Sequence, residues 1–248
     1  MASSRLTSKA GGKILFHPSY SSMKVVAYNI SRCTQGKIDY LLAAGADMYI
    51  LPECAESSYI NLLVGYEMLW TGDDDVPQKG LGVVWRSNLR VSLVDDFKKI
   101  KHHLPLLVDD GVSTRFVLAC WPTVRKELKS YPQLLLEAIR QYAPYFKAYP
   151  SIAVGDYNCY VGQASARRRL GTFEDCIAEF EKYGLRSLYH EMTGECFGCE
   201  TEPTFYWRFN EDSPYFLDYA FCNFNVASFS IGKWEKEISD HRPLIVEW

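Results

Sequence analysis

The sequence of 248 residues contains no long hydrophobic run and no excess of positive charge. A transmembrane helix needs about 20 consecutive apolar residues, and no stretch approaches that length, so we expect no membrane span. The 27 basic and 30 acidic residues give a net charge of −3. This balance argues against the broad positive field that draws many proteins onto duplex DNA.

The basic side chains that are present gather in two short clusters: Arg167 to Arg169, and Lys98, Lys99 and Lys101 with His102 and His103. Such clusters are more often solvated surface than ligand sites. We therefore expect both clusters to be exposed, with phosphate contact as the alternative.

The sequence also lacks a hydrophobic secretory segment, and its eight cysteines are scattered through apparent strands and loops. These features favour reduced thiols and a cytoplasmic location. Cys196 and Cys199 form a lone CxxC pair. A closed zinc site needs a second pair of ligands, which is not evident, so structural zinc is the less favoured alternative.

Residues 1 to 22 are rich in Ser, Lys and Gly and show little periodicity, so we expect a poorly ordered leader there. A targeting segment, or a start at Met23, is an alternative explanation. No repeat or low-complexity linker follows, which predicts one domain over residues 23 to 248.

Apolar residues make up 48% of the chain and aromatic residues 15%, enough for a substantial core. Short β-branched runs predict strands, and apolar residues at helical spacing predict helices over 131–146 and 172–184, the second with a Thr172 and Asp175 capping box. The predicted strands are 24–29, 48–52, 81–85, 116–121, 151–154, 204–207, 216–222, 227–231 and 244–248. This alternation predicts an α/β fold whose polar strand ends meet at one edge.

Seven polar residues stand directly at the ends of these strands: Asn29, Glu53, Asp156, Asn158, Asp218, Asp240 and His241. Each alone is better explained by turn capping or surface exposure. Together, four carboxylates, two amides and a histidine at strand ends indicate one acidic site. Hard oxygen ligands of this kind favour Mg²⁺ or Mn²⁺ over zinc.

These residues occur in the motifs Tyr-Asn-Ile, Leu-Pro-Glu-Cys, Gly-Asp-Tyr-Asn, Leu-Asp-Tyr and Ser-Asp-His, in that order. From about Met23 to the C-terminus the chain resembles the endonuclease/exonuclease/phosphatase superfamily, the DNase I-like proteins. Gly-Asp-Tyr-Asn with a terminal Ser-Asp-His is the specific pair. The segment Pro203-Thr-Phe-Tyr-Trp-Arg with Leu217-Asp-Tyr further resembles a bacterial subgroup of that superfamily. The resemblance implies a four-layered α/β sandwich, in which two mixed sheets pack face to face with helices outside.

The resemblance also implies a role for each strand-end residue. By this resemblance Glu53 would be the principal metal ligand, with Asn29 and Asp240 nearby through direct or water-mediated contact. Asp156 orients or deprotonates the attacking water, and Asn158 donates a hydrogen bond to the phosphoryl oxygens. Asp218 holds His241, whose protonated ring stabilises charge on those oxygens.

Two departures from the family pattern stand out. Cys120, Trp121 and Pro122 occupy a strand end where many members carry a histidine and abasic endonucleases a tyrosine, and an indole cannot relay a proton. Ser31 stands where abasic endonucleases place an aspartate, which weakens the case for abasic-site specificity. We expect Trp121 to contact the substrate, and His102 and His103 to be surface residues.

The leading hypothesis is a metal-dependent phosphodiesterase, most simply a nuclease acting on DNA or RNA. Exposed aromatic residues near the site could stack on unpaired bases. The candidates are Trp121, Tyr157, Tyr160, Tyr206 and Trp207, and we expect core packing to explain most of them. A second hypothesis gives the same site a small phosphorylated metabolite or a lipid headgroup. A third is a catalytically inactive binding module. No obligate protein partner is evident.

Overall fold

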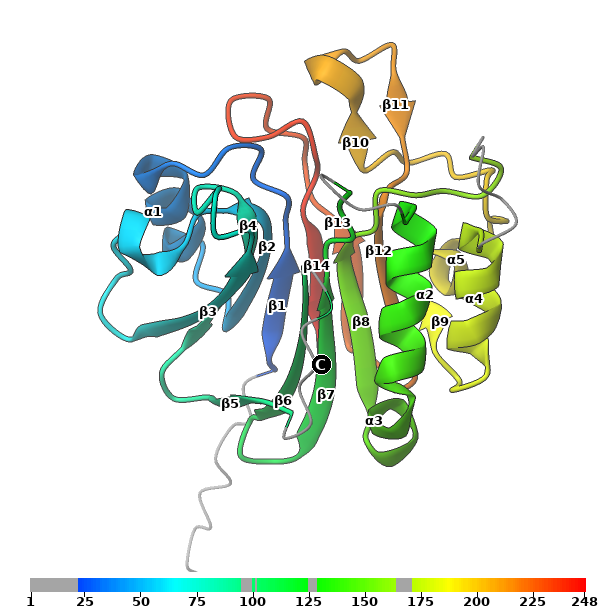
Figure 1. Ribbon diagram of the computed structural model, residues 1–248, viewed down its shortest axis with the longest axis horizontal. Helices are drawn as coiled ribbons and strands as arrows, with labels where there is room; N and C mark the ends of the chain where they lie inside the picture. Colours follow the sequence, from blue (N-terminus) through cyan, green and yellow to red (C-terminus); the bar gives the residue numbers. More distant parts are fainter. Residues whose placement is uncertain (1–21, 95–99, 101, 125–128, 164–170) are drawn as a thin grey trace, which may run out of the picture.

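The computed structural model describes residues 22–94, 100, 102–124, 129–163 and 171–248. The predicted leader, the arginine cluster at 167–169 and the lysines of the other basic cluster lie outside these residues, except Ser22. Within the described residues the chain forms two six-stranded sheets and a two-stranded hairpin (Figure 1).

The first sheet has the strand order β13-β14-β1-β2-β4-β3. Strands β1 and β2 are parallel, and the other neighbours are antiparallel. The strands span β1 Lys24–Ala27, β2 Met48–Cys54, β3 Tyr66–Gly72, β4 Gly80–Arg86, β13 Ser228–Ile231 and β14 Leu244–Glu247.

The second sheet has the order β5-β6-β7-β8-β12-β9, with β7 and β8 as its parallel pair. Its strands span β5 Arg90–Leu93, β6 His103–Asp109, β7 Thr114–Cys120, β8 Ser151–Asp156, β9 Arg186–Ser187 and β12 Asp218–Cys222. The separate hairpin consists of β10 Phe205–Tyr206 and β11 Pro214–Tyr215.

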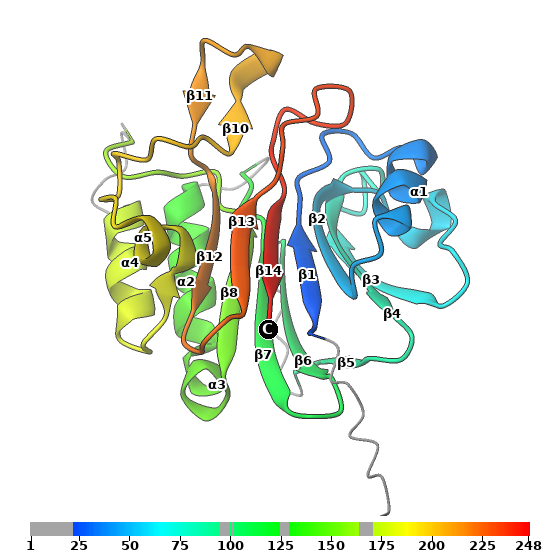
Figure 2. The ribbon, with the colours of Figure 1, turned by 180° about the vertical axis from the view of Figure 1, so that it is seen from behind.

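The two sheets pack face to face, and helices cover their outer faces (Figures 1 and 2). Helix α1 (Gln35–Ala43) lies outside the first sheet, and α2 (Tyr131–Gln141), α3 (Ala143–Ala148) and α4 (Phe173–Glu181) lie outside the second. Helix α5 (Leu188–Thr193) contacts β12. This arrangement confirms the four-layered α/β sandwich that the motifs implied.

Successive side chains along a strand point to opposite faces of the sheet, so the strands of the first sheet contribute to two hydrophobic cores. On β1, Val25 and Ala27 point into the core between the sheets, whereas Val26 points to the core under α1. Because strands such as β1 and β2 are buried on both faces, they read as continuous apolar runs in the sequence. Their ends are therefore the first places where polar side chains can stand.

The predicted second helix begins at its capping box: the Thr172 side chain accepts a hydrogen bond from the Asp175 backbone, and Asp175 accepts one from Thr172. The predicted first helix is two helices instead of one. It breaks at Tyr142 because Pro144, which has no N–H, cannot continue the ladder to the carbonyl of Arg140.

The expected surface position of His102 and His103 is wrong. Both side chains are buried, with exposed fractions of 1% and 0%. His103 begins β6, which pairs with β5 on one side and β7 on the other. The lysines next to the two histidines made this segment resemble an exposed basic cluster, so the start of the strand was not predicted. His102 packs against Trp121, with ring centroids 4.9 Å apart.

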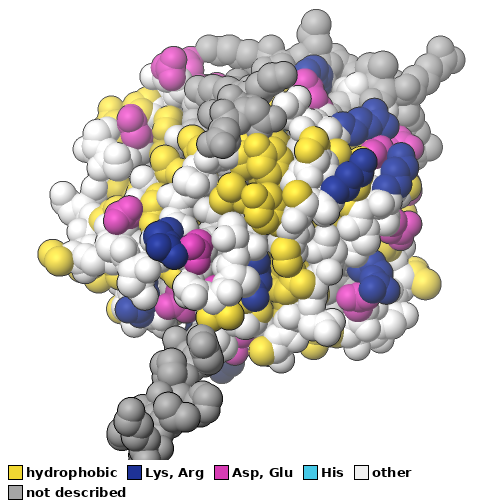
Figure 3. All heavy atoms as spheres, turned by 90° about the horizontal axis from the view of Figure 1, so that it is seen from below, with side chains coloured by type: hydrophobic (Ala, Val, Ile, Leu, Met, Phe, Trp, Pro, Cys, Tyr) yellow, Lys and Arg dark blue, Asp and Glu magenta, His cyan; other side chains and the backbone are white. Residues whose placement is uncertain are grey.

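The polar strand ends lie at the end of the sandwich from which the β10–β11 hairpin rises (Figure 1). The opposite end presents a central group of hydrophobic side chains with scattered charged ones (Figure 3). None of the helices in the described ranges is long and apolar enough to cross a membrane.

Candidate active site

The site residues come from two sheets. The first sheet supplies Asn29 after β1, Glu53 within β2, and Asp240 with His241 before β14. The second supplies Asp156 at the end of β8, Asn158 just after it, and Asp218 at the start of β12. Asp218 and Asp156 are direct partners in the antiparallel β8–β12 ladder. A pocket of about 450 Å³ is lined by five of these residues: Asn29, Glu53, Asn158, Asp240 and His241.

Asp156 is aimed by an unusual backbone. Gly155 has φ +145°, and a Cβ there would stand 2.0 Å from the carbonyl oxygen of Cys120, so only glycine fits. Two residues later Asn158 adopts φ 53°, and its backbone N–H donates to Asp156 Oδ1 at 2.9 Å. The Asn158 side chain donates to the Pro122 carbonyl at 3.2 Å. The turn therefore places both side chains at the mouth of the second sheet.

The Asp156 carboxylate is buried, and it is held from both sheets. Its Oδ2 accepts a hydrogen bond from Asn29 Nδ2 at 2.9 Å and lies 3.9 Å from His241 Nε2. Burial raises the pKa of Asp156 to about 7, against the opposing effect of nearby His241. A carboxylate with a pKa near neutrality can accept a proton from a bound water.

His241 is oriented by three contacts. Its Nδ1 lies 2.8 Å from Asp218 Oδ2, and its backbone N–H donates to Ser239 Oγ at 3.0 Å. The Phe205 ring packs beside the imidazole at 4.5 Å between centroids. Burial lowers the pKa of His241, but the carboxylates of Asp218 and Asp156 outweigh burial and raise that pKa to about 9. The imidazole is therefore cationic at neutral pH, with Nε2 directed toward Asp156.

Two hydroxyl groups hold this arrangement, and no sequence pattern singled them out. Ser239 Oγ donates to the Asn29 carbonyl at 2.5 Å while accepting from His241. Thr204 Oγ1 accepts from the backbone N–H groups of Leu217 and Asp218 at 2.9 and 3.0 Å. Both residues occur inside the recognised motifs, but a buried serine or threonine is common anywhere in a core.

Glu53 stands on a bulge in β2. The β2–β4 register shifts between Pro52 and Cys54, and Glu53 has φ 61°, a left-handed conformation that is rare for a non-glycine residue. Backbone strain of this kind concentrates at functional sites. The bulge turns the Glu53 side chain into the pocket, where its Oε2 lies 3.1 Å from Lys79 Nζ.

The donor set at the first-sheet side fits a hard divalent cation. Glu53 and Asp240 line the same pocket with carboxylate oxygens, and Glu53 already accepts a cation, the Lys79 ammonium. Asn29 fits less directly, because its Nδ2 faces Asp156 and its Oδ1 accepts from the Ser31 N–H at 3.0 Å. A contact through water suits Asn29 better.

Asp156, Asp218 and His241 also place ligand atoms within 4.8 Å of one another. Those atoms already make hydrogen bonds: Asp218 to His241, and Asp156 to Asn29 and Asn158. The cluster is therefore better suited to moving a proton than to binding a cation.

The aromatic residues divide into two groups. Core packing, expected for most of these aromatics, accounts for Tyr157, which is fully buried, and also for Trp121, which is 3% exposed although it was expected to contact the substrate. Tyr206 stacks on Trp234 at 4.0 Å. The rings that do line the pocket are those of Tyr131, Tyr160, Phe205, Trp207 and Tyr215.

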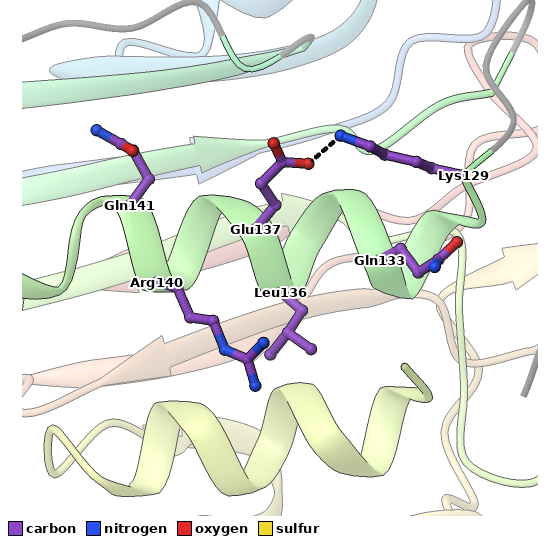
Figure 4. A pocket seen from close by; sticks show the side chains of 6 residues that line it. All are labelled: Lys129, Gln133, Leu136, Glu137, Arg140 and Gln141. Carbon is purple, nitrogen blue, oxygen red and sulfur yellow. Dashed lines mark hydrogen bonds and ion pairs between the residues drawn. The ribbon is translucent and has the colours of Figure 1, made fainter. Parts of the chain in front are cut away.

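A different pocket lies on the outer face of α2, above α4 (Figure 4). It contains the Lys129–Glu137 ion pair and the side chains of Gln133, Arg140 and Gln141. None of the strand-end residues reaches it, so it belongs to the surface of the helical layer.

No model of a known protein family matches the sequence, and no curated protein matches it. Solved structures do match. The endonuclease domain of TRAS1, a telomere-specific non-LTR retrotransposon, is 15% identical with a TM-score of 0.64, over 92% of this chain and 98% of that domain. An AP endonuclease from Archaeoglobus fulgidus is 16% identical with a TM-score of 0.62, over 90% and 98% of the two chains.

An endonuclease/exonuclease/phosphatase family protein from Bacteroides thetaiotaomicron is 14% identical with a TM-score of 0.58, over 92% of this chain and 97% of that one. At such identities the likeness concerns the fold. It confirms the DNase I-like fold that the strand-end motifs predicted.

Proposed function

We propose that this protein is a divalent-metal-dependent phosphodiesterase of the endonuclease/exonuclease/phosphatase type. The observation that carries the proposal is a pocket lined by a cation-accepting glutamate and an Asp218-held imidazolium, with the buried Asp156 carboxylate 3.9 Å from that imidazole. Phosphodiester hydrolysis needs these three elements: a proton acceptor for water, fixed positive charge for the phosphoryl oxygens, and a metal ligand.

Each residue takes one part of the chemistry. Asp156 accepts a proton as water attacks phosphorus, which its raised pKa of about 7 suits. The imidazolium of His241 faces the phosphoryl oxygens and stabilises the charge that builds on them. Asn158 adds an amide donor from the left-handed turn beside Asp156.

Glu53 would hold the cation, with Asp240 and Asn29 as the neighbouring oxygen donors. When bound, Mg²⁺ or Mn²⁺ supplies Lewis-acid charge against the phosphoryl oxygens. Asp218 and Ser239 act through His241 by fixing its orientation.

The pocket walls favour a substrate that carries bases, namely a nucleic acid or a nucleotide. Trp207 and Tyr215, which are 53% and 40% exposed, stand on the β10–β11 hairpin above the site. A second pocket of about 280 Å³ shares Tyr160 and Tyr215 with the first, so a substrate can extend past one phosphate. With a net charge of −3, stacking on unpaired bases suits the protein better than wrapping a duplex.

A small phosphorylated metabolite or a lipid headgroup is the second candidate, because about 450 Å³ is the volume of a small-ligand site. An inactive binding module is the third. Hydrolysis of bis(p-nitrophenyl) phosphate with Mg²⁺, Mn²⁺ or a chelator separates the last from the first two. Cation-dependent turnover supports the enzyme, and binding without turnover supports the module.

A substrate panel then separates nuclease from metabolite phosphoesterase. It contains single-stranded DNA, RNA, nicked duplex and inositol phosphates at equal concentration. We expect the highest kcat/KM on single-stranded nucleic acid. A kcat/KM that is tenfold or more higher on inositol phosphates would instead identify the protein as a phosphoesterase of small metabolites or lipid headgroups.

A further inference from the structure

Lys79 stands at the edge of the candidate site, immediately before β4. Its ammonium lies 3.1 Å from Glu53 Oε2 and 5.8 Å from the ring centroid of Trp121. The contact with Glu53 is on the first sheet and the contact with Trp121 is on the second, so Lys79 spans the two sheets at their polar end. The sequence did not single out this residue.

Strand order places Lys79 on the opposite flank of the site from His241. In the first sheet the order β14-β1-β2-β4 sets His241, Asn29, Glu53 and Lys79 in a row. In the second sheet the order β7-β8-β12 sets Trp121, Asp156 and Asp218 in a parallel row. With strands about 4.8 Å apart, about 14 Å separates the first-sheet strands of His241 and Lys79.

Asn29 and Asp156 join the two rows directly at 2.9 Å, so a phosphodiester lies over the polar end of the rows, in the pocket. There it meets the His241 imidazolium on one side and the Lys79 ammonium on the other. Phosphoryl transfer runs in line, so the attacking and leaving oxygens lie on opposite sides of phosphorus. Asp156 contacts the His241 side, at 3.9 Å between Oδ2 and Nε2. The leaving oxygen then departs toward Lys79 and Trp121.

We propose that Lys79 is the residue that stabilises the leaving oxygen, an inference that rests on the phosphodiesterase function proposed above. As the water oxygen bonds to phosphorus, its proton goes to Asp156. The bond from phosphorus to the leaving oxygen breaks, and that oxygen keeps the electron pair. The Lys79 ammonium donates a hydrogen bond to it, and a proton from solvent water completes the alcohol.

Its present contacts make this role accessible. Lys79 has a side chain 46% exposed on a flexible stem, and an ion pair of such exposure contributes little stability, so it exchanges partners easily. Trp121 supplies a ring face under the ammonium, a contact that favours a cation. A divalent cation held by Glu53 would repel the Lys79 ammonium from that carboxylate.

The test compares two leaving groups in Lys79→Met and the parent protein. A p-nitrophenolate leaves without help, whereas the alkoxide leaving group of a dinucleotide needs its charge stabilised. We expect Lys79→Met to lose about tenfold or more in kcat on the dinucleotide and less than about threefold on bis(p-nitrophenyl) phosphate. Lys79→Arg, which keeps the charge, should recover part of the dinucleotide activity.

Lys129→Met is the matched control. Lys129 also forms an ion pair with a glutamate and has a side chain 45% exposed, but it lies on the helical face in Figure 4. Its kcat on both substrates should equal that of the parent. Mn²⁺ titration calorimetry supplies a readout apart from activity: Lys79→Met should bind Mn²⁺ at least as tightly as the parent, because a competing cation is gone.

The outcomes are distinct. Equal losses on both substrates, no loss on either, or weaker Mn²⁺ binding by Lys79→Met would each overturn the leaving-group role. A parent protein that cleaves the aryl diester but no dinucleotide also overturns it. A parent that cleaves neither diester overturns the phosphodiesterase function itself.

Discussion

His241 Nδ1 lies 2.8 Å from Asp218 Oδ2, and both side chains are buried at the meeting of the two sheets. This bond fixes which nitrogen faces the pocket: Nε2 is left to point toward Asp156. It also keeps a positive charge in a place where burial alone would remove it. The contact with Asp218 therefore sets both the orientation and the charge of the imidazole, and variants of these residues can test it.

Asp156→Asn should lower kcat by about a hundredfold to ten-thousandfold with little change in KM, because the variant cannot accept the proton of water. His241→Gln should lower kcat as well, and glutamine is preferred to alanine because an empty site would leave Asp218 buried without a partner. Steady-state kinetics beside a thermal melt measures both. Asp109→Asn is the control, since Asp109 pairs with Arg90 at 2.7 Å and lines neither pocket. Near-normal kcat in a well-folded Asp156→Asn protein would contradict the mechanism.

Activity should follow a bell-shaped pH profile. Asp156 has its pKa raised to about 7 and must be ionised, so kcat/KM rises as pH increases through about 7; a bound cation shifts this limb downward. His241 has its pKa raised to about 9 and must be protonated, so kcat/KM falls as pH increases through about 9. Asp218→Asn removes the nearest carboxylate and should move the upper limb to lower pH. If the upper limb does not move in Asp218→Asn, the group that titrates there is not His241.

The same shifts predict how stability depends on pH. The folded pKa of His241, about 9, lies above its ordinary value of 6.5, so the stability it contributes is complete below 6.5 and is lost as pH rises through 9. Asp156, raised from 3.8 to about 7, acts in the same direction between those values. The melting temperature should therefore fall between pH 7 and pH 10, and His241→Gln should flatten the upper part of that fall.

Glu53→Gln should weaken the binding of Mn²⁺ and raise the cation concentration needed for half-maximal activity, because a charge leaves the ligand set while its shape is kept. Titration calorimetry measures the first and activity against Mg²⁺ concentration the second. Glu137→Gln is the matched control, because Glu137 is also paired with a lysine but lies on α2. Equal metal dependence in Glu53→Gln and the parent would exclude Glu53 as a ligand.

Trp121 and Trp207 should respond in opposite ways to truncation. Trp121→Ala empties a buried site and should cost about 3 to 5 kcal/mol in the free energy of unfolding. Trp207→Ala removes an exposed ring from the pocket wall and should cost about 1 to 3 kcal/mol in binding a base-containing ligand, with little effect on unfolding. Denaturant melts and oligonucleotide titrations compare the two. If Trp207→Ala bound oligonucleotides as tightly as the parent protein, Trp207 would not stack on the bases of the substrate.

The strand-end residues were predictable because apolar strands of a sandwich leave only their ends for polar groups. Asn29 and Asp156 stand out against Val-Val-Ala-Tyr and Ile-Ala-Val-Gly for that reason. The same reasoning failed at the start of β6. His102 and His103 follow lysines in the sequence, so their side chains were expected to be exposed. His103 pairs with Cys120 of β7, and the His102 carbonyl accepts from the Trp121 N–H at 2.9 Å. These contacts close the β6–β7 hairpin, and the lysines that precede the histidines give no sign of them.

Two features of the site required the three-dimensional arrangement. Trp121 was assigned to the pocket because it ends a strand, but His102, a close neighbour in space, covers its ring. Lys79 follows a turn of acidic and polar residues and has no periodic pattern of its own. Only the bulge at Glu53 and the register of β2 with β4 bring its ammonium to the site.

The hydrogen bond from Asn29 to Asp156 joins residues 127 positions apart, one from each sheet. In the proposed mechanism the proton acceptor comes from one sheet and the imidazole and metal ligand from the other, so a chain in which only one sheet has formed should not turn over substrate. The rate of turnover would then measure how much of the protein has its two sheets packed together. In a refolding experiment, recovery of turnover should trail the recovery of β-sheet circular dichroism and coincide with burial of the core between the sheets.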